Sequence, residues 1–326
     1  MAEVYRLVGD FYYLNWDFQN AAAYYNKALP HYEKLKDFNG QGLIYLDQAY
    51  IFYAKTDYLH TLELLRKAAY SFEKAGNLEK QGKLYLFQGS VYCHTGDNTH
   101  ALEILKKAMH FFVRKRNLQA QGEVCIEIGR VYFNTGNLNR ALEMYDKAML
   151  HFDETRDING QGNVYLGKGY RYNKSRKFGK ALDMYKKALP FFKKSGNRRN
   201  LAIFYYLKGE ALMESKKTTQ ALKMFKEARS LCQEEGIPLL MSEVDLSVAQ
   251  IYYDRGDNSN ALETLKKALH GFEKFENYKG IANVYWLMGN TFYNIGENER
   301  ASAMHQKALS FYKKAKCVVG QGQVCR

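Results

Sequence analysis

The sequence predicts an all-α fold: a solenoid of eight helix-turn-helix repeats of 40 residues, followed by the start of a ninth. Three observations lead to this prediction. The dipeptide Gln-Gly recurs at positions 41, 81, 121, 161 and 321, at intervals of 40 residues or multiples of 40. Lys-Ala recurs at the same interval, and a third position always holds a small residue. Between these positions, apolar residues follow the 3.6-residue period of a helix rather than the two-residue period of a strand.

The small-residue position keeps its register along the whole chain. It holds Gly9, Ala49, Gly89, Gly129, Gly169, Gly209, Ala249 and Gly289. Because no insertion or deletion interrupts it, residues 1–326 are predicted to form one repeat array. Its repeats would be 1–40, 41–80, 81–120, 121–160, 161–200, 201–240, 241–280 and 281–320, and residues 321–326 would begin the ninth.

The third repeat shows the elements that each repeat is expected to contain. The first helix is predicted from Gly82 to Thr95, and residues 96–98, Gly-Asp-Asn, supply turn chemistry. Thr99 is a candidate N-cap for a second helix from about His100 to about Asn117, which would be the longer of the two. The small residues should allow the paired helices to approach closely.

Three features depart from the regular pattern. Pro30 and Pro190 fall inside second helices, where a proline removes a hydrogen bond and costs about 3 kcal/mol, so we expect a kink or a break there. The sixth repeat lacks Gln-Gly and ends in Gly-Ile-Pro at 236–238, which predicts a local change of curvature. Neither end carries a polar capping helix, which predicts a segment of a longer protein or an incomplete gene product.

The pattern Tyr-x3-Gly-x2-Tyr-x8-Ala-x3-Leu-x2-Ala, present as Tyr85, Gly89, Tyr92, Ala101, Leu105 and Ala108, resembles the tetratricopeptide-repeat (TPR) signature. The period of 40 is longer than the usual 34, and is similar to the extended repeats of Pins-type spindle adaptors, kinesin light chains and the sensor arms of signalling proteins. The resemblance implies a right-handed superhelix whose first helices line a concave groove. It also implies that a peptide or protein domain binds in that groove.

The resemblance places three rows of first-helix residues in the groove. The first row is nearly all apolar, which fits either peptide binding or packing between helices. Chaperone-binding relatives hold a terminal carboxylate with a Lys/Asn clamp, but here Asn290 is accompanied by Trp286, so that role is disfavoured. The candidate groove residues are Leu46, Tyr50, Tyr53, Leu86, Ile126, Arg130, Phe133, Leu166, Tyr170, Tyr206, Leu246, Tyr253, Trp286, Asn290 and Tyr293.

The formal charge of +14 is concentrated in the fifth repeat, which holds twelve basic residues and a single acidic one, Asp183. A basic patch is expected where its turn lies beside the turn of the sixth repeat. Such a patch is either a solvated edge or a docking point for an acidic or phosphorylated partner. Nucleic acid is disfavoured because the fourth and seventh repeats are net negative and would interrupt a basic track. The candidate patch residues are Lys174, Arg176, Lys177, Lys180, Lys216 and Lys217.

The sequence lacks the motifs that would indicate catalysis or a cofactor. The five cysteines form no CxxC pair, the eight histidines have no metal-ligand spacing, and no phosphate-loop or nucleophile-elbow motif occurs. No apolar run is long enough to span a membrane, and the first residues do not resemble a signal peptide. These observations predict a cytoplasmic chain with reduced thiols, no cofactor and no enzymatic activity.

We therefore predict a non-enzymatic scaffold or adaptor that binds a peptide or helix of a partner protein. The alternative is a sensor or regulatory arm of a larger signalling enzyme. Nothing in the sequence indicates the oligomeric state or identifies the partner.

Overall fold

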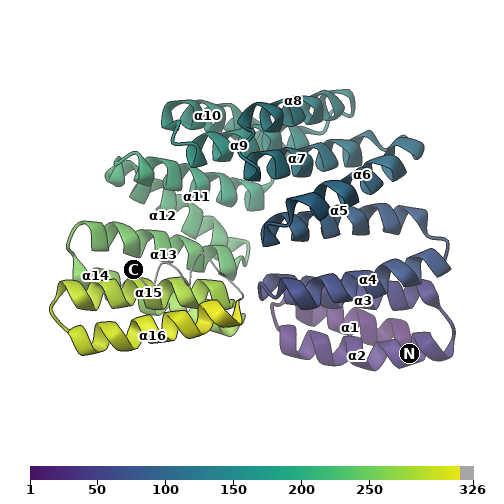
Figure 1. Ribbon diagram of the computed structural model, residues 1–326, viewed down its shortest axis with the longest axis horizontal. Coiled ribbons are helices and arrows are strands. Elements are labelled where there is room, and N and C mark those ends of the chain that lie inside the picture. Colours follow the sequence, from purple (N-terminus) through teal and green to yellow (C-terminus); the bar gives the residue numbers. More distant parts are fainter. Residues whose placement is uncertain (316–326) are drawn as a thin grey trace. The chain divides into compact units, whose positions relative to one another are not determined.

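The computed structural model describes residues 1–315, and this part of the chain consists of sixteen helices joined by short turns (Figure 1). No strand occurs within these residues, so the all-α prediction is confirmed. The predicted ninth repeat at 321–326 lies outside the described residues. The helices are α1 Ala2–Leu14, α2 Phe18–Lys34, α3 Phe38–Ala54, α4 Tyr58–Lys74, α5 Leu78–Thr95, α6 Asn98–Arg114, α7 Leu118–Asn134, α8 Leu138–Glu154, α9 Ile158–Lys174, α10 Phe178–Ser195, α11 Arg198–Glu214, α12 Thr218–Glu234, α13 Pro238–Asp254, α14 Asn258–Lys274, α15 Tyr278–Asn294 and α16 Asn298–Lys314.

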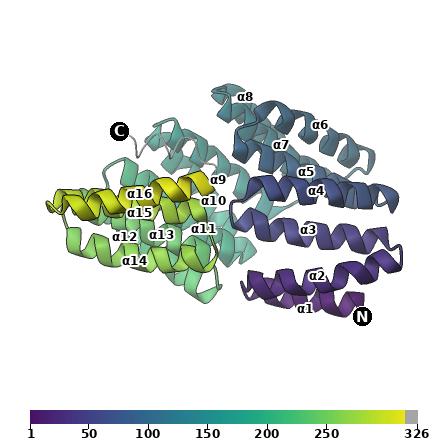
Figure 2. The same ribbon diagram turned by 60° about the horizontal axis from the view of Figure 1, so that its bottom comes forward.

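The chain divides into two compact units, Met1–Gly167 (unit 1) and the part from Lys168 onward (unit 2). Within each unit, a first helix pairs with the second helix of its own repeat, as α3 does with α4 and α11 with α12. Each second helix also packs on the first helix of the next repeat, as α4 does on α5 and α12 on α13. Figure 2 shows α1 to α4 stacked in the order of the sequence. That the two units form one array stays a prediction.

The close approach of paired helices depends on the small residues of the repeat, as predicted. A Cβ atom added at Gly9 would lie 2.5 Å from the ring of Tyr25, and one added at Gly169 would lie 2.5 Å from the ring of Tyr185. Both tyrosines are at most 1% exposed. Each glycine therefore makes room for an aromatic side chain of the paired second helix.

The helices begin earlier than the sequence suggested. The first helix of the third repeat starts at Leu78, not Gly82, because the Asn77 side chain accepts a hydrogen bond from the backbone N–H of Lys80. The cap of α6 is Asp97, whose side chain accepts from the N–H of His100, so the prediction of Thr99 is wrong. Short Asp and Asn side chains cap helix starts well. With 18 residues in α5 and 17 in α6, the prediction of a longer second helix is also wrong.

The helices do not break at the interior prolines, so that part of the prediction is wrong, while the kink stays a prediction. α2 continues through Pro30 and α10 through Pro190. Both prolines are exposed, and so are Asn26 and Lys186, the residues whose carbonyls lose a hydrogen-bond partner. Water can hydrate these carbonyls, while the buried faces of both helices still pack. Pro238 starts α13, where a missing N–H has no cost; the predicted change of curvature there stays a prediction.

Candidate functional site

Neighbouring first helices lie side by side within each unit, as α5 and α7 do in unit 1 and α11 and α13 in unit 2. The candidate groove residues lie on these helices. We call the face that they share the first-helix surface, and describe it separately for the two units.

In unit 1, aromatic side chains from α3 and α5 form one cluster on the first-helix surface. The ring centroids of Tyr50 and Phe87 are 4.7 Å apart and stacked, and Tyr53 meets Phe87 edge to face at 5.2 Å. His94 lies 5.8 Å from Tyr53. Tyr50 is 39% exposed, whereas Tyr53 and Phe87 are partly buried against the core, so Tyr50 is the open ring of the cluster. We call these rings the aromatic cluster. Such rings can bury a large apolar area against a ligand while the tyrosine hydroxyl stays in water.

The adjoining part of the unit-1 surface is polar and centres on Arg130 of α7. Its Nη1 donates to Ser90 Oγ at 3.4 Å, and its Nη2 lies 3.1 Å from Glu127 Oε1. Arg130 Nε and Glu127 Oε2 are buried and make no hydrogen bond within residues 1–315. Because neither atom is exposed, this donor and acceptor lie beneath the surface, and only the outer part of the Arg130 side chain, which is 28% exposed, can meet a ligand.

The other side of the unit-1 surface carries two aspartates, Asp10 on α1 and Asp47 on α3. Arg6 lies 2.9 Å from Asp10 and 3.7 Å from Asp47, and the Tyr25 hydroxyl donates to Asp10 at 2.8 Å. Burial, together with the negative charge of Asp10, raises the pKa of Asp47 to about 7. Arg6 also pairs with Glu3 at 2.8 Å, so one arginine faces three carboxyl groups.

The apolar candidate row in unit 1 lies mainly within the helix packing. Leu46 is 9% and Leu166 8% exposed. Leu86 and Ile126 are partly buried against neighbouring core clusters, and Phe133 is partly exposed. Leu46 and Leu166 therefore favour the packing interpretation that the sequence left open.

In unit 2, the first-helix surface carries charged and hydroxyl groups. Lys174 of α9 lies 3.2 Å from Glu214 of α11, and the guanidinium of Arg171 stands 4.5 Å from the centroid of the Tyr170 ring. The Ser247 hydroxyl donates to Glu210 Oε1 at 2.6 Å. Lys174, predicted as part of the basic patch, is therefore paired with a carboxylate.

Glu243 of α13 was not singled out from the sequence, yet it is the most perturbed carboxyl group on this surface. Burial and the negative charge of Glu210 raise its pKa to about 7, while the charge of Lys279 opposes the rise. Burial also raises the pKa of Glu210 and, strongly, that of Tyr206. The sequence signal for this group was Glu210, one of two acidic residues, with Asp10, in a row that elsewhere carries Tyr, Ser, Arg, Gln or Asn.

The other unit-2 candidates differ in exposure. Leu246, Tyr253 and Trp286 are partly buried against one core cluster of α13 to α16. Asn290 Oδ1 lies 3.0 Å from Nε2 of His305. Tyr293 is 68% exposed and is thus the most open aromatic candidate of unit 2.

The basic patch lies at the turns between α9 and α10 and between α11 and α12. Arg176 and Lys216 occupy these turns with positive φ angles of 57° and 63°. Lys177 and Lys217 are the N-cap residues of α10 and α12, and neither side chain makes a capping hydrogen bond. Lys180 stands 5.8 Å from the Tyr172 ring. The N-terminus is the positive end of the helix dipole, so a lysine at the N-cap places a second positive charge there. The starts of α10 and α12 are therefore both strongly positive.

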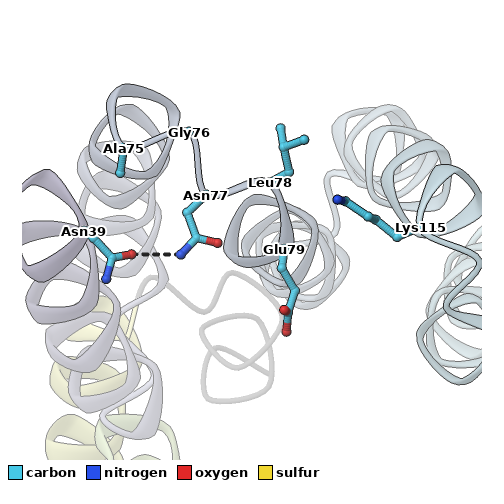
Figure 3. A pocket seen from close by; sticks show the side chains of 7 residues that line it. All are labelled: Asn39, Ala75, Gly76, Asn77, Leu78, Glu79 and Lys115. Atoms are coloured by element: carbon cyan, nitrogen blue, oxygen red, sulfur yellow. Dashed lines mark hydrogen bonds between the residues drawn. The ribbon is translucent and has the colours of Figure 1, made fainter.

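A pocket in unit 1 lies elsewhere, at the turns that join repeats (Figure 3). Asn77 Nδ2 donates to Asn39 Oδ1 at 2.8 Å across this pocket, and Glu79 and Lys115 stand at its rim. None of the candidate groove residues lines it. Its hydrogen bond ties one repeat to the next, which is a structural role.

Two features of residues 1–315 bear on other functions. No group of three or more His, Cys, Asp or Glu side chains in this range could hold a metal ion. No helix in the same range is long and apolar enough to cross a membrane.

Comparison with protein families identifies the repeat. The tetratricopeptide-repeat model matches residues 122–194, which span α7 to α10, and residues 240–314, which span α13 to α16. The chain is a tetratricopeptide-repeat protein. The model of the soluble NSF attachment protein, SNAP, matches residues 1–148 of this TPR protein. No curated protein sequence matches it.

Solved structures with the same fold share little sequence with this TPR protein. A Rap protein complexed with competence and sporulation factor has 12% identity and a TM-score of 0.69 over 92% of this chain and 81% of its own. The Rap conjugation gene regulator of plasmid pLS20 in complex with the Phr* peptide has 13% identity and a TM-score of 0.65, over 87% and 76%. A signal transduction ATPase with a tetratricopeptide-repeat sensor from Pyrococcus horikoshii has 16% identity and a TM-score of 0.58, over 99% and 50%. At these identities the likeness concerns the fold alone.

Proposed function

We propose that this TPR protein is a non-enzymatic scaffold that binds a peptide or helix of a partner protein on its first-helix surfaces, with the basic patch docking an acidic segment. The observation that carries the proposal is the aromatic cluster of unit 1, in which Tyr50 is exposed and rests on the partly buried Phe87. Tyr50, Tyr53 and Phe87 come from two repeats and form one continuous face.

The chemistry beside this cluster suits a peptide. Rigid aromatic side chains bury large areas at a low entropy cost and are common binding hot spots. The Arg130 side chain, which is 28% exposed, offers hydrogen-bond donors on the same surface. A peptide could place an apolar side chain on the rings and a backbone carbonyl against Arg130.

The basic patch suits an acidic partner. Within residues 1–315, Arg176, Lys177, Lys216 and Lys217 form no ion pair, and the two lysines Lys216 and Lys217 are exposed. Exposed charges of one sign accelerate association with an oppositely charged segment, and salt weakens the attraction. Lys174 contributes less because Glu214 already pairs with it.

The similar structures agree with a peptide ligand, since one of them is a complex with the Phr* peptide. The alternative of a sensor arm is favoured by a separate observation. The signal transduction ATPase with a TPR sensor matches 99% of this chain, but this chain covers only 50% of that protein. A sensor arm would act on an attached effector, whereas a scaffold binds its partner as an isolated chain.

The aromatic surface is tested by selecting peptides from a random 12-residue phage-display library on the immobilised chain and measuring their affinity by fluorescence anisotropy. Tyr50→Ala should weaken binding about tenfold or more, because a hot-spot aromatic contributes about 2 kcal/mol or more. Tyr70→Ala on α4 is the matched control, since Tyr70 is 58% exposed but lies on a second helix. Failure to enrich any peptide, or equal losses in both variants, would refute the role of this surface.

The basic patch is tested with a poly-glutamate peptide and a single-stranded RNA over a series of salt concentrations. Lys216→Glu with Lys217→Glu should weaken peptide binding, and the effect should shrink as salt rises. Lys106→Glu with Lys266→Glu changes the net charge equally at exposed positions outside the patch. RNA binding that resists salt and survives reversal of the patch would contradict the proposal.

A further inference from the structure

Tyr50 of α3 and Tyr170 of α9 occupy the same position of the repeat, but only Tyr170 has basic side chains over its ring. The guanidinium of Arg171 stands 4.5 Å and the ammonium of Lys174 5.5 Å from the centroid of that ring. No basic side chain of residues 1–315 lies over the ring of Tyr50, which is 39% exposed and stacks on Phe87 at 4.7 Å. The open face of Tyr50 can therefore take a cation from a ligand.

A carboxyl group stands beside this open ring. Asp47 precedes Tyr50 by three residues, which places both side chains on one face of α3. The Asp47 side chain is 21% exposed, so a ligand can reach it. Arg6 lies 3.7 Å from Asp47, but it already pairs with Glu3 at 2.8 Å and with Asp10 at 2.9 Å. Because three carboxyl groups share one guanidinium, a second cation would be attracted to Asp47.

The pKa of Asp47 agrees with this shortage of positive charge. Burial and the negative charge of Asp10 raise it to about 7, although the charges of Arg6 and Lys80 oppose the rise. A cation that bound beside Asp47 would lower this pKa and favour the ionised carboxylate.

The charges of the neighbouring first helices favour the same kind of ligand. Glu123 of α7 is exposed and forms no ion pair within residues 1–315. Two basic groups of the surface are already neutralised, since Arg130 pairs with Glu127 at 3.1 Å and Lys83 with Glu79 at 2.9 Å. The unit-1 first-helix surface therefore attracts positive charge, although the whole chain has a formal charge of +14.

We propose that the unit-1 first-helix surface binds a basic peptide, and that an arginine side chain of this peptide lies on Tyr50 with its guanidinium paired to Asp47. Arginine suits this place better than lysine, because its planar group can stack on a ring and also donate two parallel hydrogen bonds to a carboxylate. An apolar neighbour in the peptide can still cover Tyr53 and Phe87. This arginine site rests on the proposed peptide-binding function and specifies the class of peptide.

The first test is the composition of the peptides that the random 12-residue phage-display library yields at pH 8, where Asp47 is ionised. Enriched peptides should contain more arginine than the unselected library. In synthetic copies of the tightest peptide, each arginine is replaced in turn by glutamine, and one replacement should weaken binding about tenfold. Lysine at that place should recover only part of the affinity.

The second test is the coupling between this arginine and Asp47. Asp47→Asn should weaken binding of the arginine peptide about tenfold at pH 8 and leave that of the glutamine peptide unchanged. Glu63→Gln is the matched control, because it removes the same charge from the same repeat but on the second helix α4, where Glu63 pairs with Lys67. Tyr50→Leu keeps an apolar side chain without a ring, so it should reduce the preference for arginine over glutamine about threefold. Circular dichroism checks that the variants stay helical.

The outcomes distinguish the arginine site from the peptide-binding function. Enriched peptides that are neutral or acidic and still depend on Tyr50 would overturn the arginine site and leave peptide binding intact. Equal losses of the arginine and glutamine peptides in Asp47→Asn, or an equal loss in Glu63→Gln, would also overturn it. If no peptide is enriched, both the arginine site and the proposed function are refuted.

Discussion

Replacing Glu243 with Gln is predicted to stabilise the protein above neutral pH and to leave its stability unchanged in acid. Burial and the charge of Glu210 raise the pKa of Glu243 from 4.5 to about 7. The folded protein therefore holds this proton more tightly than the unfolded chain does. The free energy of unfolding is therefore highest, with respect to this group, below pH 4.5, and it falls as the pH rises through about 7.

The size of this loss of stability follows from the rise in the pKa of Glu243. One pKa unit corresponds to about 1.4 kcal/mol, so a rise of this size corresponds to about 3 kcal/mol of lost stability at pH 8 to 9 relative to pH 4. Glutamine keeps the shape of the side chain and cannot ionise, so Glu243→Gln should recover most of this loss. Part of the gain is offset because the amide gives up the attraction to Lys279.

The assay is urea denaturation followed by circular dichroism at pH 5, 6, 7, 8 and 9, comparing midpoints of the unmodified chain and Glu243→Gln. The gap between them should open between pH 5 and 8. Glu263→Gln is the control, because the exposed Glu263 pairs with Lys267 and its pKa is lowered, so no gain is expected there. In a Glu210→Gln background the gap should shrink, since the neighbouring charge is gone. A gap that does not change with pH, or one that favours the unmodified chain at pH 9, would refute the reasoning.

Thermal denaturation tests two further predictions. Asp97→Ala should lower the free energy of unfolding by about 1 kcal/mol, because it removes the cap of α6. Lys177→Asp should raise it by a similar amount, because aspartate supplies the cap that α10 lacks. A lower stability of Lys177→Asp would contradict this account. Gly169→Ala should cost about 1 to 3 kcal/mol because the new Cβ would lie 2.5 Å from the Tyr185 ring. Gly179→Ala, which meets nothing within 4 Å, should gain up to about 1 kcal/mol, and equal shifts in the two glycine variants would count against the packing argument.

The repeat period carried most of the information on the fold. Because each repeat must pack on its neighbours, a fixed interval specified the number of helices and their pairing. The start of α5 was missed because the helix was taken to begin at Gly82 of the Gln-Gly dipeptide, although Asn77 caps it. The start of α6 was missed because Thr99 was taken as its cap instead of Asp97. The break at Pro30 was predicted from helix propensity, which takes no account of solvent. Because Pro30 is exposed, water can hydrate the carbonyl that loses its hydrogen bond, and the helix continues.

The candidate site was harder to predict because its properties arise between repeats. The sequence shows which residues recur at the groove positions, but not which side chains pair across repeats. Glu214 pairs with Lys174 and neutralises one of the positive charges of the predicted patch. Glu214 follows Lys174 by 40 residues, so the pairing could have been anticipated from the stacking of repeats. The shifted pKa of Glu243 depends on burial by neighbouring helices, and no local pattern encodes that.

The charges of unit 2 restrict the partner that the proposed function requires. An acidic segment is attracted by Arg176 and Lys217 at the turns, but on the first-helix surface of the same unit it would meet Glu210 and Glu243. There it would raise the pKa of Glu243 further, and binding would take up a proton. A basic group at the same place would lower that pKa and release one.

A single partner that uses both regions must therefore be acidic at one end and neutral or basic at the other. Calorimetric titration in two buffers of different ionisation enthalpy measures the number and sign of the protons exchanged. Proton release near pH 7, absent in Glu243→Gln, would indicate a basic group on the first-helix surface. An acidic peptide that binds with no proton exchange occupies the turns alone, and in that case Glu243→Gln should not change its affinity.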